Sequence, residues 1–113
     1  MFSVVVPTFN RSHCIVDTLR SVVAQNYRPI EVIIVDDGST DSSVKFIKSN
    51  FPGVKLVKHT KNRGFPAAVN TGARSATGNL VALINSDVVP KKHFLKNALS
   101  HFEDGKVFAV SFN

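Results

Sequence analysis

The sequence predicts an α/β protein built on an open, mostly parallel sheet of about five strands, with helices on both faces. Two observations predict this class. Short runs rich in Val and Ile alternate with longer amphipathic segments along the chain, which is the pattern of successive β-α units. Most of these runs are apolar on both faces, as expected of parallel strands that helices cover on each side.

The strands are predicted where the apolar runs occur. They cover Phe2 to Val6, Glu31 to Val35, Val54 to Lys58, Leu80 to Ile84 and Lys106 to Phe112. The elements therefore follow the order βαβαβαβαβ. Because no linker or repeat interrupts this order, residues 1–113 are expected to form a single domain, and a chain of this size can bury one continuous core.

The helices between these strands are predicted from apolar residues at helical spacing. Ser39 or Asp41 is expected to cap the second helix, with Val44, Ile47 and the neighbouring Phe46 on its inward face. The third helix is expected over Phe65 to Ala76, and its many small residues should let it approach the sheet closely. Pro90 suits the first turn of the last helix.

Composition restricts the possible partners. The net charge of +6 favours an anionic partner such as a diphosphate, an acidic membrane surface or nucleic acid, and charge alone does not choose among them. The absence of interleaved aromatic platforms argues against nucleic acid. No apolar run is long enough to span a bilayer, so a cytoplasmic protein is expected, with peripheral association at the cytoplasmic membrane face as a variant. The single cysteine, Cys14, excludes an internal disulfide.

Polar clusters follow three of the predicted strands. They are Pro7 to Asn10, Asp36 to Asp41 and Asn85 to Asp87. Because the carboxyl ends of parallel strands share one edge of a sheet, these clusters are expected to meet there and form a ligand site. Finding Asp37 and Asp87 on opposite sides of the molecule would contradict this hypothesis.

The acidic character of these clusters suggests a role for a divalent cation. A carboxylate can accept hydrogen bonds from a base N–H or a ribose hydroxyl. Mg²⁺ or Mn²⁺ can also lie between carboxylates and phosphate oxygens, and would neutralise the charge of a departing diphosphate. The four histidines share no spacing typical of a metal site and are expected on the surface or in packing.

Four segments, in order, resemble the motifs of family 2 glycosyltransferases. The segments are Val4 to Arg11, Glu31 to Asp41, Asn62 to Phe65 with Asn70 to Gly72, and Leu83 to Asp87. The resemblance covers nearly the whole chain. It implies a Rossmann-like GT-A fold and the N-terminal half of such an enzyme, which binds a nucleotide-sugar donor, either a UDP- or a dTDP-sugar.

The resemblance also implies roles for individual residues. Those expected at the donor are Pro7, Thr8, Asn10, Asp36, Asp37, Asn62, Gly64, Asn85 and Ser86. Asp36 or Asp37 should accept an N–H of uracil or thymine, with Asp36 favoured. Asp87 should bind the Mg²⁺ or Mn²⁺ ion that bridges the diphosphate.

Two residues depart from the family pattern. Asn85 stands where the Asp-x-Asp motif begins, which resembles rhamnosyltransferase-like members. Val69 stands where many members carry an arginine, so a phosphate or base contact is expected either to be missing or to come from Arg63 or Arg74.

The resemblance places the acceptor and the general base beyond this segment. Inverting transfer to a hydroxyl of a sugar or lipid-linked acceptor needs such a base. The chain is therefore expected to bind the donor while lacking the base. A noncatalytic nucleotide-binding or assembly domain of the same fold is the alternative. An exposed sheet edge would also favour a homo-oligomer.

Overall fold

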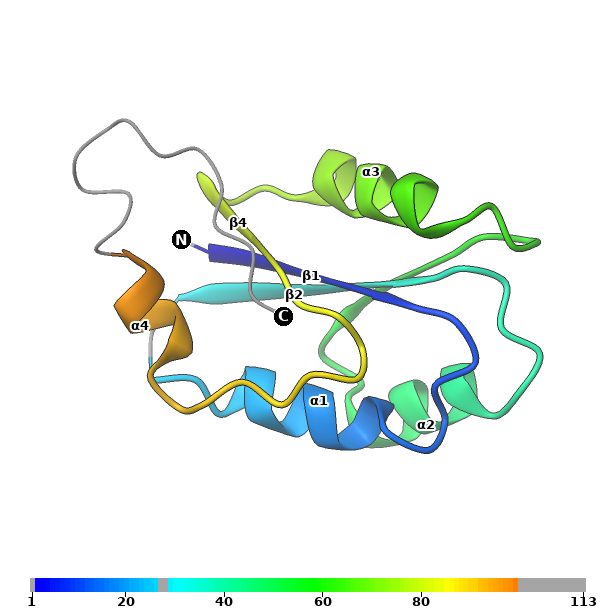
Figure 1. Ribbon diagram of the computed structural model, residues 1–113, viewed down its shortest axis with the longest axis horizontal. Coiled ribbons are helices and arrows are strands. Elements are labelled where there is room, and N and C mark those ends of the chain that lie inside the picture. The colour runs from blue at the N-terminus through cyan, green and yellow to red at the C-terminus, as the bar shows by residue number, and fades with distance from the viewer. Residues whose placement is uncertain (1, 27–28, 100–113) are drawn as a thin grey trace.

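A computed structural model of the chain describes residues 2–26 and 29–99. Its strands are β1 (Phe2–Thr8), β2 (Ile30–Asp36), β3 (Lys55–Lys58) and β4 (Leu80–Leu83), and its helices are α1 (Ile15–Val23), α2 (Ser43–Asn50), α3 (Phe65–Ser75) and α4 (Phe94–Leu99). The four strands are parallel and lie in the order β3-β2-β1-β4. One face of the sheet is covered by α3 and the other by α1 and α2 (Figure 1). The predicted parallel α/β class is confirmed, while the predicted strand at 106–112 lies outside the described residues.

The two central strands carry the core because their side chains alternate between the faces of the sheet. On one face, Val32 and Ile34 of β2 pack in the larger cluster with Ile15 of α1. On the other face, Ile33 and Val35 pack in a smaller cluster under α3. Both faces are apolar, which explains why the sequence of β2 is a continuous hydrophobic run.

The third helix lies unusually close to the sheet, as its small residues predict. Gly72 faces β1 and β2 at a point where a side chain has no room. A Cβ atom there would overlap Val5 Cγ1 and lie 3.3 Å from Val35 Cγ2. The glycine therefore sets the distance between α3 and the two central strands.

Two expectations about α2 are decided by the structure. Neither Ser39 nor Asp41 is the N-cap of this helix, because the N-cap is Ser42, which makes no side-chain capping hydrogen bond. Asp41 Oδ1 accepts a 2.9 Å hydrogen bond from the N–H of Ser43, the first residue of α2. The inward position expected for Phe46 is wrong, because this side chain is exposed while Ile47 beside it is fully buried.

The expectation that the last helix begins near Pro90 is also wrong, because α4 begins at Phe94. Gln25 and Asn26, just after α1, hold the segment before α4 in a loop. Gln25 Nε2 donates to the Lys91 carbonyl at 2.7 Å, and the Asn26 N–H donates to the Lys92 carbonyl at 2.8 Å. In addition, the Leu95 N–H donates to Gln25 Oε1 at 3.0 Å instead of to a carbonyl group of an earlier helical turn.

Candidate functional site

A cleft of about 560 Å³ lies at the carboxyl ends of the strands. Its walls are formed by Pro7, Thr8, Phe9, Asn10, Arg11, Asp37, Asn62, Gly64, Phe65, Ala68, Asn85, Ser86 and Asp87. The strand register explains why these distant segments meet. Thr8 at the end of β1 pairs with Asp36 at the end of β2, and β4 pairs with β1 on its other side. The predicted convergence of the three polar clusters is confirmed, and Asp37 and Asp87 share the cleft.

Asp37 is held most firmly of the acidic residues in the cleft. Its Oδ1 is 2.7 Å from His59 Nδ1 and accepts the Arg63 N–H at 2.9 Å. Its Oδ2 accepts the Gly64 N–H, also at 2.9 Å. Burial alone would raise the pKa of Asp37, but these hydrogen bonds outweigh it and hold the pKa below its ordinary value. The carboxylate is therefore ionised at neutral pH.

The number of donors around Asp37 limits what a ligand can add. An ionised carboxylate offers about four lone-pair positions, two on each oxygen. The protein occupies both positions on Oδ1 and one on Oδ2. Asp37 therefore retains one acceptor position, on Oδ2, for a donor group in the cleft.

Asp36 lies beside Asp37 in the sequence but in a different environment. It is 2% exposed and is not among the residues that line the cleft. Its carboxylate accepts the Ser39 N–H at 3.0 Å and the Ser39 hydroxyl at 2.6 Å, which closes the turn after β2. The structure thus brings Asp37 to the cleft and gives Asp36 a partner within its own loop.

The last residue of β1 contributes a buried hydroxyl to the cleft wall. Thr8 is 3% exposed, and its Oγ1 has no hydrogen-bond partner among the described residues. A buried hydroxyl without a partner costs free energy, so such an atom on a cleft wall is suited to meet a polar ligand.

Asn10 joins the first polar loop to the second. It adopts a left-handed backbone conformation, with φ of 52°, which asparagine tolerates better than most residues. Its Oδ1 accepts the Thr40 N–H at 2.8 Å, and its own N–H donates to Ser39 Oγ at 2.9 Å. Asn10 therefore fixes the shape of this cleft wall.

Gly38 and Gly64 lie where the loop after β2 meets the segment before α3. Both have positive φ, and a Cβ on Gly38 would lie 2.6 Å from the backbone nitrogen of Asn62. The loop after β2 therefore packs directly against the segment before α3. Across this contact, Asn62 Nδ2 donates to the Asp37 carbonyl at 3.4 Å.

The segment after β4 is anchored to α1. The Ser86 carbonyl accepts a 2.8 Å hydrogen bond from the buried hydroxyl of Thr18. The Val88 N–H donates to the Asn85 carbonyl at 3.1 Å, which forms a tight turn. Asp87 is exposed at this turn, and none of the described residues donates a hydrogen bond to its carboxylate.

The carboxylate of Asp87 suits a metal ion that binds together with a phosphate group. Within residues 2–26 and 29–99, no group of three or more His, Cys, Asp or Glu side chains could hold a metal ion. Mg²⁺ is commonly held by one or two carboxylates, with water and substrate phosphates completing its shell. The uncommitted Asp87 carboxylate fits this mode of binding.

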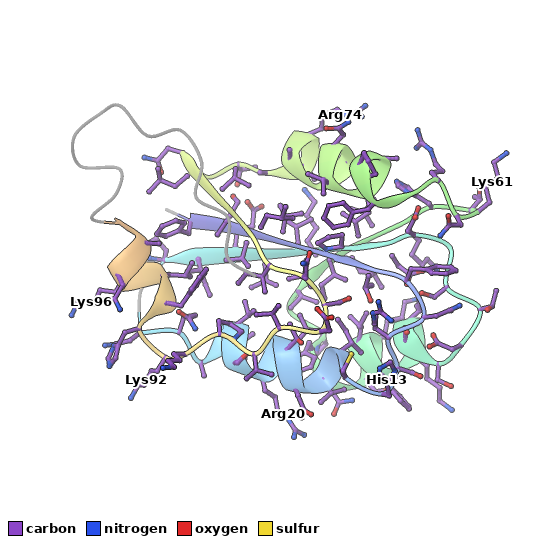
Figure 2. The ribbon with its side chains drawn as sticks, in the orientation of Figure 1. His13, Arg20, Lys61, Arg74, Lys92 and Lys96 are labelled. Atoms are coloured by element: carbon purple, nitrogen blue, oxygen red, sulfur yellow. The ribbon has the colours of Figure 1, made fainter. Side chains whose placement is uncertain are left out.

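Arg11 is the cation that sequence reasoning missed. Among the described residues that line the cleft, it is the one with a positive charge. Arg74 instead lies on the outer side of α3 (Figure 2), where its Nε donates to the Asn70 carbonyl. The side chain of Arg63 is exposed outside the lining as well, so neither expected arginine borders the cleft.

Other lining residues were also missed as site residues, and some could have been found. Phe9 belongs to the first polar cluster and Arg11 follows it directly, so their position after β1 was a usable signal. Phe65 lies next to Gly64 and is 53% exposed. His59, which contacts Asp37, gave no signal because its partner is 22 residues away in the chain.

No helix in the described part of the chain has both the length and the apolar character needed to cross a bilayer.

The fold and this cleft define a parallel α/β domain with a polar cleft at the carboxyl ends of its strands, and comparison with known proteins identifies its family. The family model described as "Glycosyl transferase family 2" matches residues 3–112. The chain therefore belongs to glycosyl transferase family 2.

Individual relatives agree with this assignment. An uncharacterized glycosyltransferase of Nostoc sp. is 33% identical over 111 residues, which cover 96% of this chain and 34% of that protein. S. aureus TarS 1-349, solved in complex with UDP-GlcNAc, superposes with a TM-score of 0.82 at 30% identity, over 91% of this chain and 31% of that one. The mannosyltransferase PcManGT of Pyrobaculum calidifontis, in complex with GDP-Man and Mn²⁺, gives 0.85 at 33% identity, over 94% and 33%.

The chain spans about a third or less of the length of the curated relatives that it matches most strongly. Its solved neighbours share the Rossmann-like GT-A fold and bind nucleotide sugars, in one case with a divalent metal.

Proposed function

We propose that residues 1–113 form the donor-binding part of an inverting glycosyltransferase that uses a UDP- or dTDP-sugar with Mg²⁺ or Mn²⁺. The acceptor is a hydroxyl group of a sugar or of a lipid-linked saccharide. One observation carries the proposal: an ionised, nearly saturated Asp37 and an uncommitted Asp87 line the same cleft from different strands. We place the enzyme in the cytoplasm or at the cytoplasmic membrane face.

The single acceptor position on Asp37 favours a pyrimidine base. Uracil and thymine each present one imide N–H, which one carboxylate lone pair satisfies. Guanine presents two neighbouring N–H donors, which call for two acceptor positions at once. Asp37 rather than Asp36 is the proposed base contact, since Asp37 lines the cleft and Asp36 does not. Phe9 and Phe65, 40% and 53% exposed on the cleft wall, offer apolar surface to the base and the ribose.

Other lining residues fit the polar parts of the donor. The partnerless Thr8 hydroxyl can bond the nucleoside. Asn85, at the first position of an Asn-x-Asp motif typical of rhamnosyltransferase-like members, can bond the ribose. Arg11 can contact the diphosphate and would supply the positive charge that Val69 lacks. Asp87 would hold the metal ion, which stabilises the leaving diphosphate.

We place the general base elsewhere in the enzyme. Within the described lining residues, the carboxylates are those of Asp37 and Asp87, and the proposal assigns both to the donor. This arrangement equally suits a noncatalytic domain that binds a nucleotide, which remains the second candidate function.

Calorimetric titration tests the proposal. The chain is titrated with UDP, dTDP and GDP, each with and without Mn²⁺. Binding of UDP or dTDP that Mn²⁺ strengthens, with weaker binding of GDP, supports it. Tighter binding of GDP would refute the pyrimidine assignment. A donor-hydrolysis assay then tests for residual chemistry, because release of UDP from a UDP-sugar would exclude a noncatalytic domain.

A further inference from the structure

A buried histidine links the base-binding wall of the cleft to α3. His59 follows β3, and its backbone N–H donates to the Asp36 carbonyl at 2.8 Å. Its side chain is only 6% exposed, and both ring nitrogens have partners. Nδ1 lies 2.7 Å from Asp37 Oδ1, and Nε2 lies 2.8 Å from the hydroxyl of Thr71 in α3.

The chemistry of Asp37, His59 and Thr71 determines which atom in each hydrogen bond carries the proton. The ionised carboxylate of Asp37 only accepts hydrogen bonds, so His59 Nδ1 must carry a proton. In a neutral imidazole, Nε2 is then an acceptor, and the Thr71 hydroxyl donates to it. The chain of hydrogen bonds therefore runs from Thr71 through His59 to Asp37.

The hydrogen bonds from Thr71 through His59 to Asp37 determine which acceptor position of Asp37 remains open. The two backbone donors, from Arg63 and Gly64, approach different carboxylate oxygens, and His59 fills the second position on Oδ1. With Oδ1 fully occupied, a donor in the cleft can use Oδ2 only. Without His59, the carboxylate would regain a second open position and could turn within its pocket.

We propose that His59 is a positioning residue for nucleotide recognition, orienting Asp37 so that one oxygen atom faces a single base N–H. The inference rests on the proposed function for its ligand and on the geometry alone for the hydrogen-bond chain. A purely structural role, in which His59 only joins β3 to α3, is the competing explanation.

Nuclear magnetic resonance tests the hydrogen-bond chain without any ligand. Long-range proton–nitrogen spectra of the ¹⁵N-labelled chain report which ring nitrogens carry protons, and the His59→Asn variant identifies the His59 signals. A protonated Nδ1 at neutral pH supports the proposal. A histidine protonated at Nε2 alone would overturn it.

Two chemically similar substitutions distinguish a positioning role of His59 from a purely structural role. In His59→Asn the amide nitrogen can take the place of Nδ1 and donate to Asp37. In His59→Gln the longer side chain places its amide near Nε2, within reach of Thr71, and leaves Asp37 without this donor. We expect His59→Asn to bind UDP within about threefold of wild type and His59→Gln to bind about tenfold more weakly, as for a lost hydrogen bond to a charged group.

The matched control is Ser3→Ala, which removes a hydrogen-bond network at the other end of the sheet. Ser3 Oγ donates to Glu31 at 2.6 Å and accepts the Gly78 N–H at 2.8 Å. This variant should lower thermal stability without changing the ratio of UDP affinity to Mn²⁺-pyrophosphate affinity. In His59→Gln that ratio should fall about tenfold, because pyrophosphate lacks a base.

The outcomes distinguish the two proposals. If wild type does not bind UDP, the proposed function fails, and the spectra alone decide the hydrogen-bond chain. If wild type binds UDP and His59→Gln keeps the wild-type ratio, positioning by His59 is overturned. Equal losses in the Asn and Gln variants would also overturn it, since only the Gln variant leaves Asp37 without its third donor.

Discussion

The substitution Asp37→Asn examines base recognition most directly. It keeps the shape of the side chain while replacing one carboxylate oxygen with an NH₂ group. If the remaining oxygen stays at Oδ1, it still accepts from His59 and from the Arg63 N–H. The new NH₂ group then occupies the Oδ2 position, where it faces the Gly64 N–H and the cleft.

The Asp37→Asn substitution should change both the affinity for UDP and the free energy of unfolding. A lost hydrogen bond between a charged acceptor and the base N–H weakens binding by about 1.5–3 kcal/mol, or about 10- to 150-fold in affinity. The Gly64 N–H also loses its acceptor, which lowers the free energy of unfolding by about 1–3 kcal/mol. UDP binding should therefore fall strongly in a variant that remains folded at low temperature.

The same variant should change base preference. Cytosine has an unprotonated ring nitrogen where uracil has its imide N–H, so an NH₂ donor matches cytosine. We expect UDP affinity to fall about 10- to 150-fold and CDP affinity to fall less or to rise. Titrations of UDP and CDP, compared at one temperature below the unfolding transition, measure the ratio. An unchanged preference for UDP over CDP would refute the role of Asp37 as the base acceptor.

Four further predictions concern the metal, the diphosphate, the packing of α3 and acid stability. Asp87→Ala should abolish the strengthening of UDP binding by Mn²⁺ and leave uridine binding unchanged; titrations in which Mn²⁺ still strengthens binding would remove Asp87 from the site. Arg11→Gln should weaken UDP binding about tenfold and uridine binding little, and equal losses for both ligands would argue against a phosphate contact. Gly72→Ala should lower the free energy of unfolding by about 1–3 kcal/mol in urea titration, because the added methyl overlaps Val5; unchanged stability would contradict the close approach of α3. Burial alone would raise the pKa of Asp41, but hydrogen bonds from Ser43 and Ser12 lower it from 3.8 to about 2, so its contribution to stability is present above pH 3.8 and is lost as pH falls towards 2. Asp41→Asn should therefore flatten the fall in stability over that range, and an identical acid profile would contradict this reasoning.

Periodicity and residue type predicted most of the architecture. The apolar runs located β1, β2 and β4 within a few residues, because buried parallel strands must be apolar on both faces. Small residues predicted the close approach of α3, which Gly72 makes possible. Parallel strands bring their carboxyl ends to one edge, so the three polar clusters could be assigned to one site from the sequence alone.

Sequence patterns gave a wrong prediction where the same residue type is found in more than one structural setting. Phe46 and Ile47 are neighbouring apolar residues on a short amphipathic helix, and only the packing of α2 decides that Ile47 is buried. Pro90 suits a helix start, yet hydrogen bonds from Gln25 and Asn26 hold the following carbonyl groups in a loop. The partners in these contacts are far apart in the chain.

The sequence by itself determined the class of fold, the edge of the sheet that carries the cleft and nine of the thirteen residues that line it. Only the tertiary structure shows that Asp37 lines the cleft and Asp36 does not, because both are acidic and neighbours in the sequence. Asp36 turns to Ser39 within its own loop, whereas Asp37 meets His59 and the Arg63 and Gly64 amides. Those partners come from segments beyond β3, and the order of the strands brings them together, which no spacing along the chain encodes.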